Sequence, residues 1–288
     1  MSLGNLPLAE DFVKSAKKAL YFSAKAHESA AKVAEKKLND KKTAGTHYQL
    51  GSDLFLATAS MPDRAAELMT LAGKMYEDID LEASIQLHLN AIVIYETENR
   101  GRFGLEEFRY LCSLLVKNNR YDKAIEILNR LSFQCVKLNN KVELCKTYLS
   151  ILLVFLAKGD DVEATKQMDN FSQDSYFTRS PEFSAAEKIL LSFKEFDQEK
   201  LDKAIRDPAI NDLNSNLRKL AYTLTVPGFS RNVLGIKSND FSESVADKLK
   251  SPVLNPDLAK SDELSNQNTY KNTFNNFSVE DDDDGGFL

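Results

Sequence analysis

The sequence predicts an all-α fold in which antiparallel helical hairpins stack into a TPR-like superhelix with a repeat of about forty residues. Small residues recur every forty positions, which is the strongest sign of a repeat: Ala44, Ser84, Ala124, Ala164 and Ala204. Apolar residues recur about half a repeat earlier: Leu71, Leu111, Ile151 and Leu191, followed five residues later by Tyr76, Val116, Leu156 and Phe196. The composition also favours helices, because Ala, Leu, Lys and Glu are abundant whereas Gly (11) and Pro (7) are few.

Each repeat is expected to contain two helices of roughly 14 to 17 residues joined by short turns. The segments 117–120 (KNNR) and 158–160 (KGD) have the composition of such turns. A single hairpin cannot bury both of its apolar faces, so it stacks on its neighbours, and residues such as Ala124 and Ala164 allow close approach of helix backbones. Aromatic residues at helical spacing are expected to fill the core between hairpins: Phe103, Phe108, Tyr110, Phe155 and Phe193.

The repeat pattern fades at both ends of the chain. Before Ala44 we expect one helical stretch over about 11–38, and after Ala204 a helix over 211–225 that stops at 226–228 (VPG). Residues 238–280 are rich in Ser, Asn and Asp and carry only a weak helical pattern near 241–249, which predicts a flexible linker. The chain should therefore divide into a helical-repeat body, 1–237, and a linker with a disordered acidic tail, 238–288.

The charge of the chain is concentrated in that tail. From Ser238 onward there are 11 acidic and 4 basic residues, which leaves 32 acidic and 33 basic residues in the body. A nearly neutral body is not typical of proteins that bind nucleic acid, which carry a basic excess. We therefore expect no nucleic-acid partner.

Cysteine usage and hydropathy favour a cytoplasmic protein. Cys112, Cys135 and Cys145 lie inside helical patterns without C-x-x-C spacing, so no disulfide framework is expected. No run approaches the ~18 apolar residues that a membrane-spanning helix needs, and residues 1–7 lack the pattern of a signal peptide.

The sequence offers no constellation typical of an enzyme. His27, His47 and His88 are far apart in the sequence and belong to no metal-ligand motif, and no phosphate-binding loop or nucleophile motif is present. His88 is interpreted as a partly buried packing residue and Cys112 as a core thiol. No catalytic residue, metal site or cofactor is therefore predicted.

Charged residues suggest two binding regions instead. Four aspartates, Asp281, Asp282, Asp283 and Asp284, precede Gly285-Gly286 and the apolar pair Phe287 and Leu288. Such an end combines long-range attraction to a basic groove with a small apolar anchor, although acidic tails also serve as solubilising devices. Taken singly, the basic residues of the central repeats, such as Lys117, Arg120, Lys141 and Lys146, fit an ordinary solvated surface.

Two segments of the body and the end of the chain resemble a known family. The segments 119–124 (NRYDKA) and 219–228 (KLAYTLTVPG), with the ending 285–288 (GGFL), are similar to the soluble NSF attachment proteins (SNAPs), and to their gamma type most of all. Phe287 stands where the gamma type has Leu. The resemblance covers about residues 10–230, and family members carry further helices before the segment that matches 22–31.

The resemblance implies an adaptor for SNARE disassembly in vesicle fusion and intracellular transport, including ER–Golgi transport. It implies a C-terminal helical bundle after the repeats, a face that binds assembled, syntaxin-type SNARE complexes, and a tail that recruits and stimulates NSF, a hexameric ATPase. Asp281 to Asp284, Phe287 and Leu288 are then expected to contact NSF, and Lys117, Arg120, Lys141 and Lys146 the SNARE bundle. Membrane association would be peripheral, transient and through SNAREs. The alternatives are a scaffold subunit of another cytosolic complex and a helical-repeat transferase, which would need grouped ionisable residues in a pocket.

Overall fold

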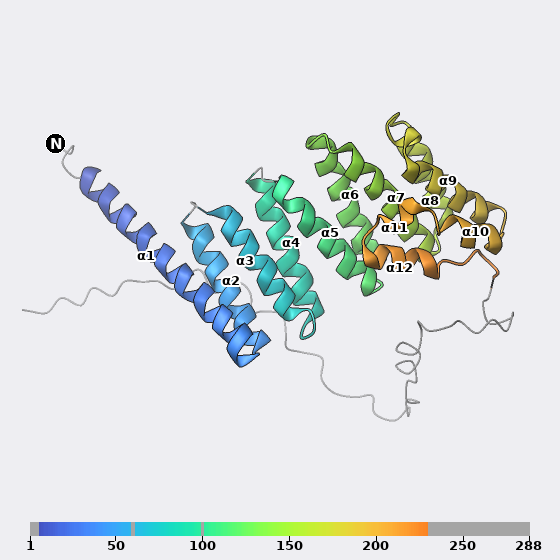
Figure 1. The fold of residues 1–288 in the computed structure, drawn as a ribbon. Coiled ribbons are helices and arrows are strands. Elements are labelled where there is room, and N and C mark those ends of the chain that lie inside the picture. The colour runs from blue at the N-terminus through green and yellow to red at the C-terminus, as the bar shows by residue number, and fades with distance from the viewer. Residues whose placement is uncertain (1–5, 59–60, 99–100, 230–288) are drawn as a thin grey trace, which may run out of the picture. The chain divides into compact units, whose positions relative to one another are not determined.

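The computed structural model describes residues 6–58, 61–98 and 101–229, with side chains from residue 11 onward. Within these ranges the chain is helical and contains no β-strand, so the predicted all-α class is confirmed (Figure 1). The elements in chain order are α1 (Leu6–Val33), the π-helical turn η1 (Ala34–Leu38), α2 (Lys41–Ala57), α3 (Pro62–Tyr76), α4 (Leu81–Thr97), α5 (Gly101–Lys117), α6 (Tyr121–Lys137), α7 (Lys141–Lys158), α8 (Asp161–Phe171), the 3-10 turn η2 (Phe177–Arg179), α9 (Pro181–Lys194), α10 (Gln198–Ala204), α11 (Pro208–Asn211) and α12 (Ser215–Thr223).

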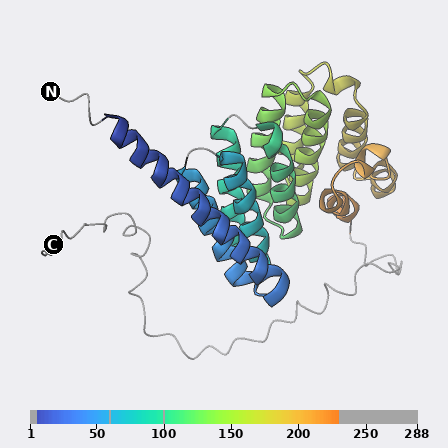
Figure 2. The same ribbon diagram turned by 60° about the vertical axis from the view of Figure 1, so that its left-hand side comes forward.

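Consecutive helices from α1 to α8 run antiparallel and pack side by side, as both views show (Figures 1 and 2). Helices α2 to α7 are 15 to 18 residues long, close to the expected length, whereas α8 has 11 residues and α10 only 7. The expected first helix is present but begins earlier, at Leu6, and its last turn is the π-helical η1. The hairpin stack is therefore most regular in the middle of the body.

The forty-residue repeat corresponds to buried helix contacts. Ala44, Ser84, Ala124 and Ala164 have no exposed surface and Ala204 is 6% exposed. Each lies in the first or second turn of α2, α4, α6 and α8, or at the end of α10, where a larger side chain would push neighbouring helices apart. The interpretation of these residues as close-packing positions is confirmed.

The turns between hairpins follow a common local code. Asn39, Asn119, Asn139 and Gly159 adopt positive φ angles, between 51° and 85°, at the ends of η1, α5, α6 and α7. Gly and Asn tolerate this left-handed conformation, which ends a helix. The next residue is the N-cap of the following helix, and the side chains of Asp40, Asn140 and Asp160 accept hydrogen bonds from backbone N–H groups of the first turn.

The core consists of two hydrophobic clusters that share α4. Leu87 and Ala91 belong to the cluster of α1–α4, whereas Ile85 and Ile92 belong to the cluster that continues through α12. Because α4 presents one set of side chains to each side, it couples the first hairpins to the rest of the body.

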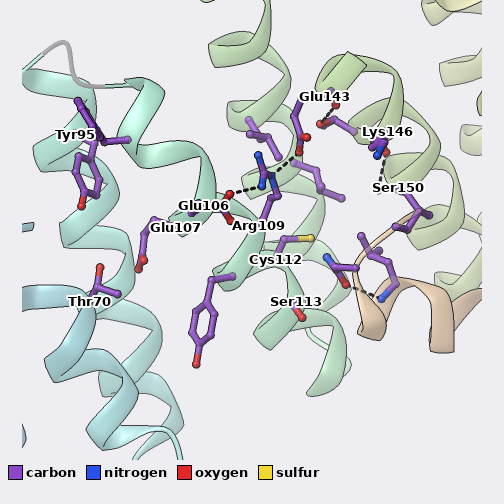
Figure 3. Close-up of a pocket in the computed structure, with 18 of the residues that line it drawn as sticks. Thr70, Tyr95, Glu106, Glu107, Arg109, Cys112, Ser113, Glu143, Lys146 and Ser150 are labelled. Atoms are coloured by element: carbon purple, nitrogen blue, oxygen red, sulfur yellow. Dashed lines mark hydrogen bonds and ion pairs between the residues drawn. The ribbon is translucent and has the colours of Figure 1, made fainter. Parts of the chain in front are cut away.

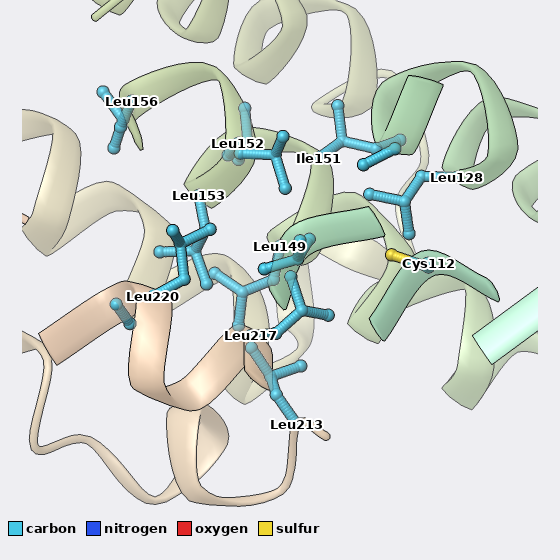
Figure 4. Packing of buried hydrophobic residues seen from close by; sticks show 14 of the residues in the cluster. Cys112, Leu128, Leu149, Ile151, Leu152, Leu153, Leu156, Leu213, Leu217 and Leu220 are labelled. Atoms are coloured by element: carbon cyan, nitrogen blue, oxygen red, sulfur yellow. The ribbon is translucent and has the colours of Figure 1, made fainter. Parts of the chain in front are cut away.

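The end of the body folds back on its middle. Helix α12 packs against α5 and α7, which precede it by about 60 to 100 residues in the chain. Leu213, Leu217 and Leu220 lie beneath Leu149 and Leu153 of α7 (Figure 4). The prediction of one continuous helix over 211–225 is wrong, because α11 ends at Asn211 and Asn214 caps a new helix that begins at Ser215.

Several predicted core residues lie at the surface. Phe103 is 62% exposed, Leu191 48% and Phe196 65%, whereas Phe108 and Phe193 are buried as expected. Phe196 adopts a positive φ of 54° just after α9, so it lies beyond the helix rather than on its buried face. The boundary at residue 237 and the predicted linker over 238–280 lie outside the described residues.

Candidate partner-binding surface

The four basic residues assigned to SNARE binding lie at two opposite ends of the hairpins. Lys117 ends α5 and Arg120 is the N-cap of α6, so both lie at the α5–α6 turn. Lys141 begins α7 at the α6–α7 turn, and Lys146 lies five residues further along α7. Since α6 has 17 residues, about 25 Å separates the two turns. The four residues therefore do not form one cluster.

Two of these four side chains are engaged within the molecule. Arg120 lies 3.1 Å from the carboxylate of Glu82, and Lys141 lies 3.7 Å from that of Asp174. Lys117 and Lys146 have no ion-pair partner within 4.0 Å among the described residues. Their positive charges are therefore the more available to an external partner.

Lys146 lines a groove of about 680 Å³ that runs along α5 between α3, α4, α6 and α7 (Figure 3). The groove carries charges of both signs. Arg109 donates to Glu143 at 2.7 Å and to Glu106 at 2.5 Å, and Lys74 lies 4.9 Å from the ring centre of Tyr110. Of the three basic residues that line the groove, Arg109 and Lys74 make these contacts, whereas Lys146 makes neither an ion pair nor a cation–π contact with a described residue there.

Helix α12 and the turn before it close one side of this groove. Asp212, Leu213, Asn214 and Leu217 contribute to the lining. The side-chain amide of Asn216 donates hydrogen bonds to the hydroxyl and the backbone carbonyl of Ser113 on α5, at 2.8 and 3.2 Å. The shape of the groove therefore depends on the docking of α12.

Many charged residues to which the sequence analysis gave no role form ion pairs with residues about one repeat away. Each pair joins neighbouring hairpins with a separation of 2.6 or 2.7 Å: Lys41 with Asp78, Lys123 with Glu82, Arg130 with Glu96, Arg109 with Glu143, and Lys158 with Asp122. Exposed pairs of this kind contribute about 0 to 1 kcal/mol each. Their main effect is to neutralise these charges within the molecule, so that fewer charged side chains are available to a partner.

Glu28 is an ion-pair hub between α1 and α3, because three basic side chains converge on its carboxylate. Lys25, Lys32 and Arg64 all donate to its carboxylate, which is only 5% exposed. Burial alone would raise the pKa of Glu28, but hydrogen bonds from Lys32, Arg64 and Lys25 outweigh it and lower the pKa to about 2. Glu28 is therefore ionised at neutral pH and fixes three cations in place.

His88 and Cys112 behave as structural groups. His88 is fully buried and its Nδ1 lies 2.5 Å from Glu107, so it is a packing residue, more buried than predicted. Burial raises the pKa of the Cys112 thiol to about 12, as expected for an inert core thiol. Across the described residues there is no group of three or more His, Cys, Asp or Glu that could hold a metal ion.

One arrangement was missed by the sequence reasoning. His27 and His47, which the sequence left as isolated histidines, lie with their Nδ1 atoms 3.0 Å apart between α1 and α2. Their spacing of twenty positions matches no ligand motif, and only the antiparallel packing of the two helices brings them together.

The tail residues Asp281, Asp282, Asp283, Asp284, Phe287 and Leu288 lie outside the described residues. Their assignment to NSF binding stays a prediction. None of the helices within the described ranges has the length and hydrophobicity needed to cross a bilayer.

Comparison with known proteins identifies the family. The model of the family "Soluble NSF attachment protein, SNAP" matches residues 10–209, which run from α1 into α11. The chain belongs to the SNAP family. Its name describes attachment rather than catalysis, which places this helical stack among adaptors and not enzymes.

Two SNAP relatives are of the gamma type, as the resemblance implied. The chain is 28% identical over 212 residues to the gamma-soluble NSF attachment protein of Dictyostelium discoideum and 26% identical over 202 residues to that of Arabidopsis thaliana. These matches cover 74% and 70% of this chain, and 65% and 69% of the two relatives. The chain thus spans just under two thirds of the first relative. Helix α12 lies beyond the part that the family model matches.

Proposed function

We propose that this SNAP chain is an adaptor that binds assembled, syntaxin-type SNARE complexes and recruits and stimulates the hexameric ATPase NSF to take them apart. The observation that supports it is the family match over residues 10–209, which includes almost all of the helical stack. The names of both gamma-type relatives describe attachment to NSF. The chain itself would hydrolyse nothing.

A rigid stack of hairpins suits the binding of an elongated helical bundle. SNARE bundles are acidic outside, so lysines on one face could hold them by charge without reading a particular sequence. Lys146 and Lys117 are the stronger candidates because no carboxylate pairs with them in the described body. Arg120 and Lys141 would have to give up Glu82 and Asp174 to take part.

The end of the chain supplies the proposed NSF contact. Asp281 to Asp284 would attract a basic groove on NSF, and Phe287 with Leu288 would supply an apolar anchor. The protein would act in the cytoplasm and reach membranes peripherally and transiently, through the SNAREs that it binds.

The decisive experiment is a pulldown from cell extract with the full chain as bait, under ATP-free conditions and again with ATP and Mg²⁺. We expect SNAREs and NSF to be recovered together without ATP and to be released when ATP is supplied. Recovery of another stable cytosolic complex with neither SNAREs nor NSF would favour the scaffold alternative and overturn the proposal.

A further inference from the structure

His27 and His47 form a half-buried pair at the contact of α1 with α2. Their Nδ1 atoms are 3.0 Å apart, and the ring centres lie 5.2 Å apart with the planes tilted by 33°. The pair belongs to neither the groove nor the proposed SNARE and NSF contacts.

Small residues explain why the two rings meet. Ala24 and Ala31 flank His27 on α1, and Ala44 and Gly51 flank His47 on α2, in both cases three residues before and four after. These positions face the partner helix, and a Cβ at Gly51 would lie 3.4 Å from the backbone oxygen of Ala24. The close approach of the two backbones places both imidazoles in register.

The Nδ1–Nδ1 contact requires one ring to donate its N–H and the other to accept with its lone pair, so one of the two Nδ1 atoms carries the proton. When the donor ring carries that proton on Nε2 instead, both Nδ1 lone pairs are free to bind an ion. A metal ion can take the place of the shared proton. With metal–nitrogen bonds of about 2.0 to 2.1 Å, nitrogens 3.0 Å apart subtend an angle of about 95° at the ion. That is near the angle between adjacent ligands in the tetragonal sites of Cu²⁺ and Ni²⁺.

We propose that His27 and His47 form a two-histidine site for a late first-row divalent metal ion, with Cu²⁺ the preferred ion and Ni²⁺ a weaker one. Water fills the remaining positions, because the described residues place no third His, Cys, Asp or Glu at the pair. The bound ion cross-links α1 to α2. The preference for Cu²⁺ over Ni²⁺ follows from the general order of divalent affinities.

The test is titration of the purified full chain with CuCl₂ and NiCl₂, and with MgCl₂ as a hard-ion control, for wild type, His27→Ala and His47→Ala. Each single variant should bind Cu²⁺ about 100-fold more weakly than wild type, because the second imidazole acts at a high effective concentration. Mg²⁺, which prefers oxygen ligands, should not distinguish the variants. Gln49→Ala, an exposed change on the same helix, should bind like wild type.

The tail aspartates and the terminal amine are common to all variants, so they add the same background of metal binding to every titration.

Two further measurements, of the metal's ligands and of folding, accompany the titrations. Electron paramagnetic resonance of the Cu²⁺ complex should show coupling to two nitrogens in wild type and to one in each variant. Circular dichroism without metal checks folding, and His27→Gln and His47→Gln replace any Ala variant that fails to fold. Equal Cu²⁺ affinity in wild type and either variant, or an effect of only one histidine, would overturn the proposal.

Discussion

Asn216 on α12 donates its side-chain amide to the hydroxyl and the carbonyl of Ser113 on α5, although 103 positions separate the two residues. The contact ties the last described helix to the middle of the stack. It is polar and half-buried, and Leu217 and Leu220 bury the apolar face of α12 beside it (Figure 4). The docked helix is thus held by both an apolar face and a specific hydrogen-bonded partner.

Replacing Asn216 by Ala should lower the free energy of unfolding by about 1 to 2 kcal/mol, because two hydrogen bonds are lost at a partly buried contact. Urea unfolding followed by circular dichroism measures the change. Lys219→Ala, an exposed neighbour on α12, is the matched control and should change it by less than about 0.5 kcal/mol. Equal effects of both changes would mean that the Ser113 contact does not stabilise the docked helix.

Glu28 should make the stability of the first hairpins depend on pH. Its pKa is lowered to about 2 in the folded chain, so the stabilisation is complete above the unfolded pKa of about 4.5 and is lost as the pH falls toward 2. Glu28→Gln should therefore cost up to about 3 kcal/mol at pH 7 and much less near pH 2. Unfolding of wild type and variant at pH 7, 4 and 2.5 measures this.

The exposed Glu126→Gln is the control for that series, since its carboxylate is in no ion pair with a described residue within 4.0 Å. Because no ion pair is lost, its effect on the free energy of unfolding should be small. A constant difference between wild type and Glu28→Gln across the whole range would contradict the assigned role of the ion-pair hub.

Gly73 should resist the substitution that usually stabilises helices. Gly→Ala inside a helix normally gains about 1 kcal/mol, but a Cβ at Gly73 would lie 2.7 Å from His88 Nε2. The His88 ring cannot move away because it is fully buried and bound to Glu107. We expect Gly73→Ala to destabilise by about 1 to 2 kcal/mol in thermal or urea unfolding. A gain in stability would show that this interface is looser than the contact implies.

The two lysines of α7 should contribute unequally to SNARE binding. Lys146→Glu should weaken binding at low salt more than Lys141→Glu, because Lys141 is partly neutralised by Asp174 at 3.7 Å. Affinity for a purified SNARE complex at two salt concentrations measures the difference, which added salt should reduce. Lys166→Glu on α8, whose side chain pairs with Glu163, is a charge-matched control. Unchanged affinity in the Lys141/Lys146 double variant at low salt would mean that neither residue contributes to SNARE binding.

Substitutions in the acidic part and in the apolar part of the tail should have different effects on SNARE disassembly by purified NSF. Changing Asp281 to Asp284 into Asn should slow association and flatten its salt dependence, because charge acts mainly on encounter. Phe287→Ala should cost roughly 1 to 3 kcal/mol of apolar contact if the ring is buried on docking, and so reduce stimulation of the ATPase. Thermal stability should be unaffected by both. An undiminished rate for a chain ending at Glu280 would make the tail a solubiliser only.

Much of the fold could be predicted because its signals are local. Helical periodicity, the Asn and Gly residues at helix ends, and the buried alanines at forty-residue spacing are patterns within one or two turns or one repeat. The wrong predictions of core residues also have physical causes. Phe196 satisfies the apolar spacing but lies past the end of α9, and Phe103 is apolar yet faces the groove instead of the core.

The sequence by itself determined the helices, their lengths in the middle of the body, and the residues at which they approach one another. Only the tertiary structure decided that α12 returns to α5, that His27 meets His47, and that Arg120 and Lys141 are paired within the molecule whereas Lys146 is not. The reason is that helix formation depends on neighbours three and four residues away, whereas these contacts depend on the angle at which each hairpin packs on the next. Small differences in that angle add up along a stack, so contacts across several hairpins are set by the packing of every interface between them.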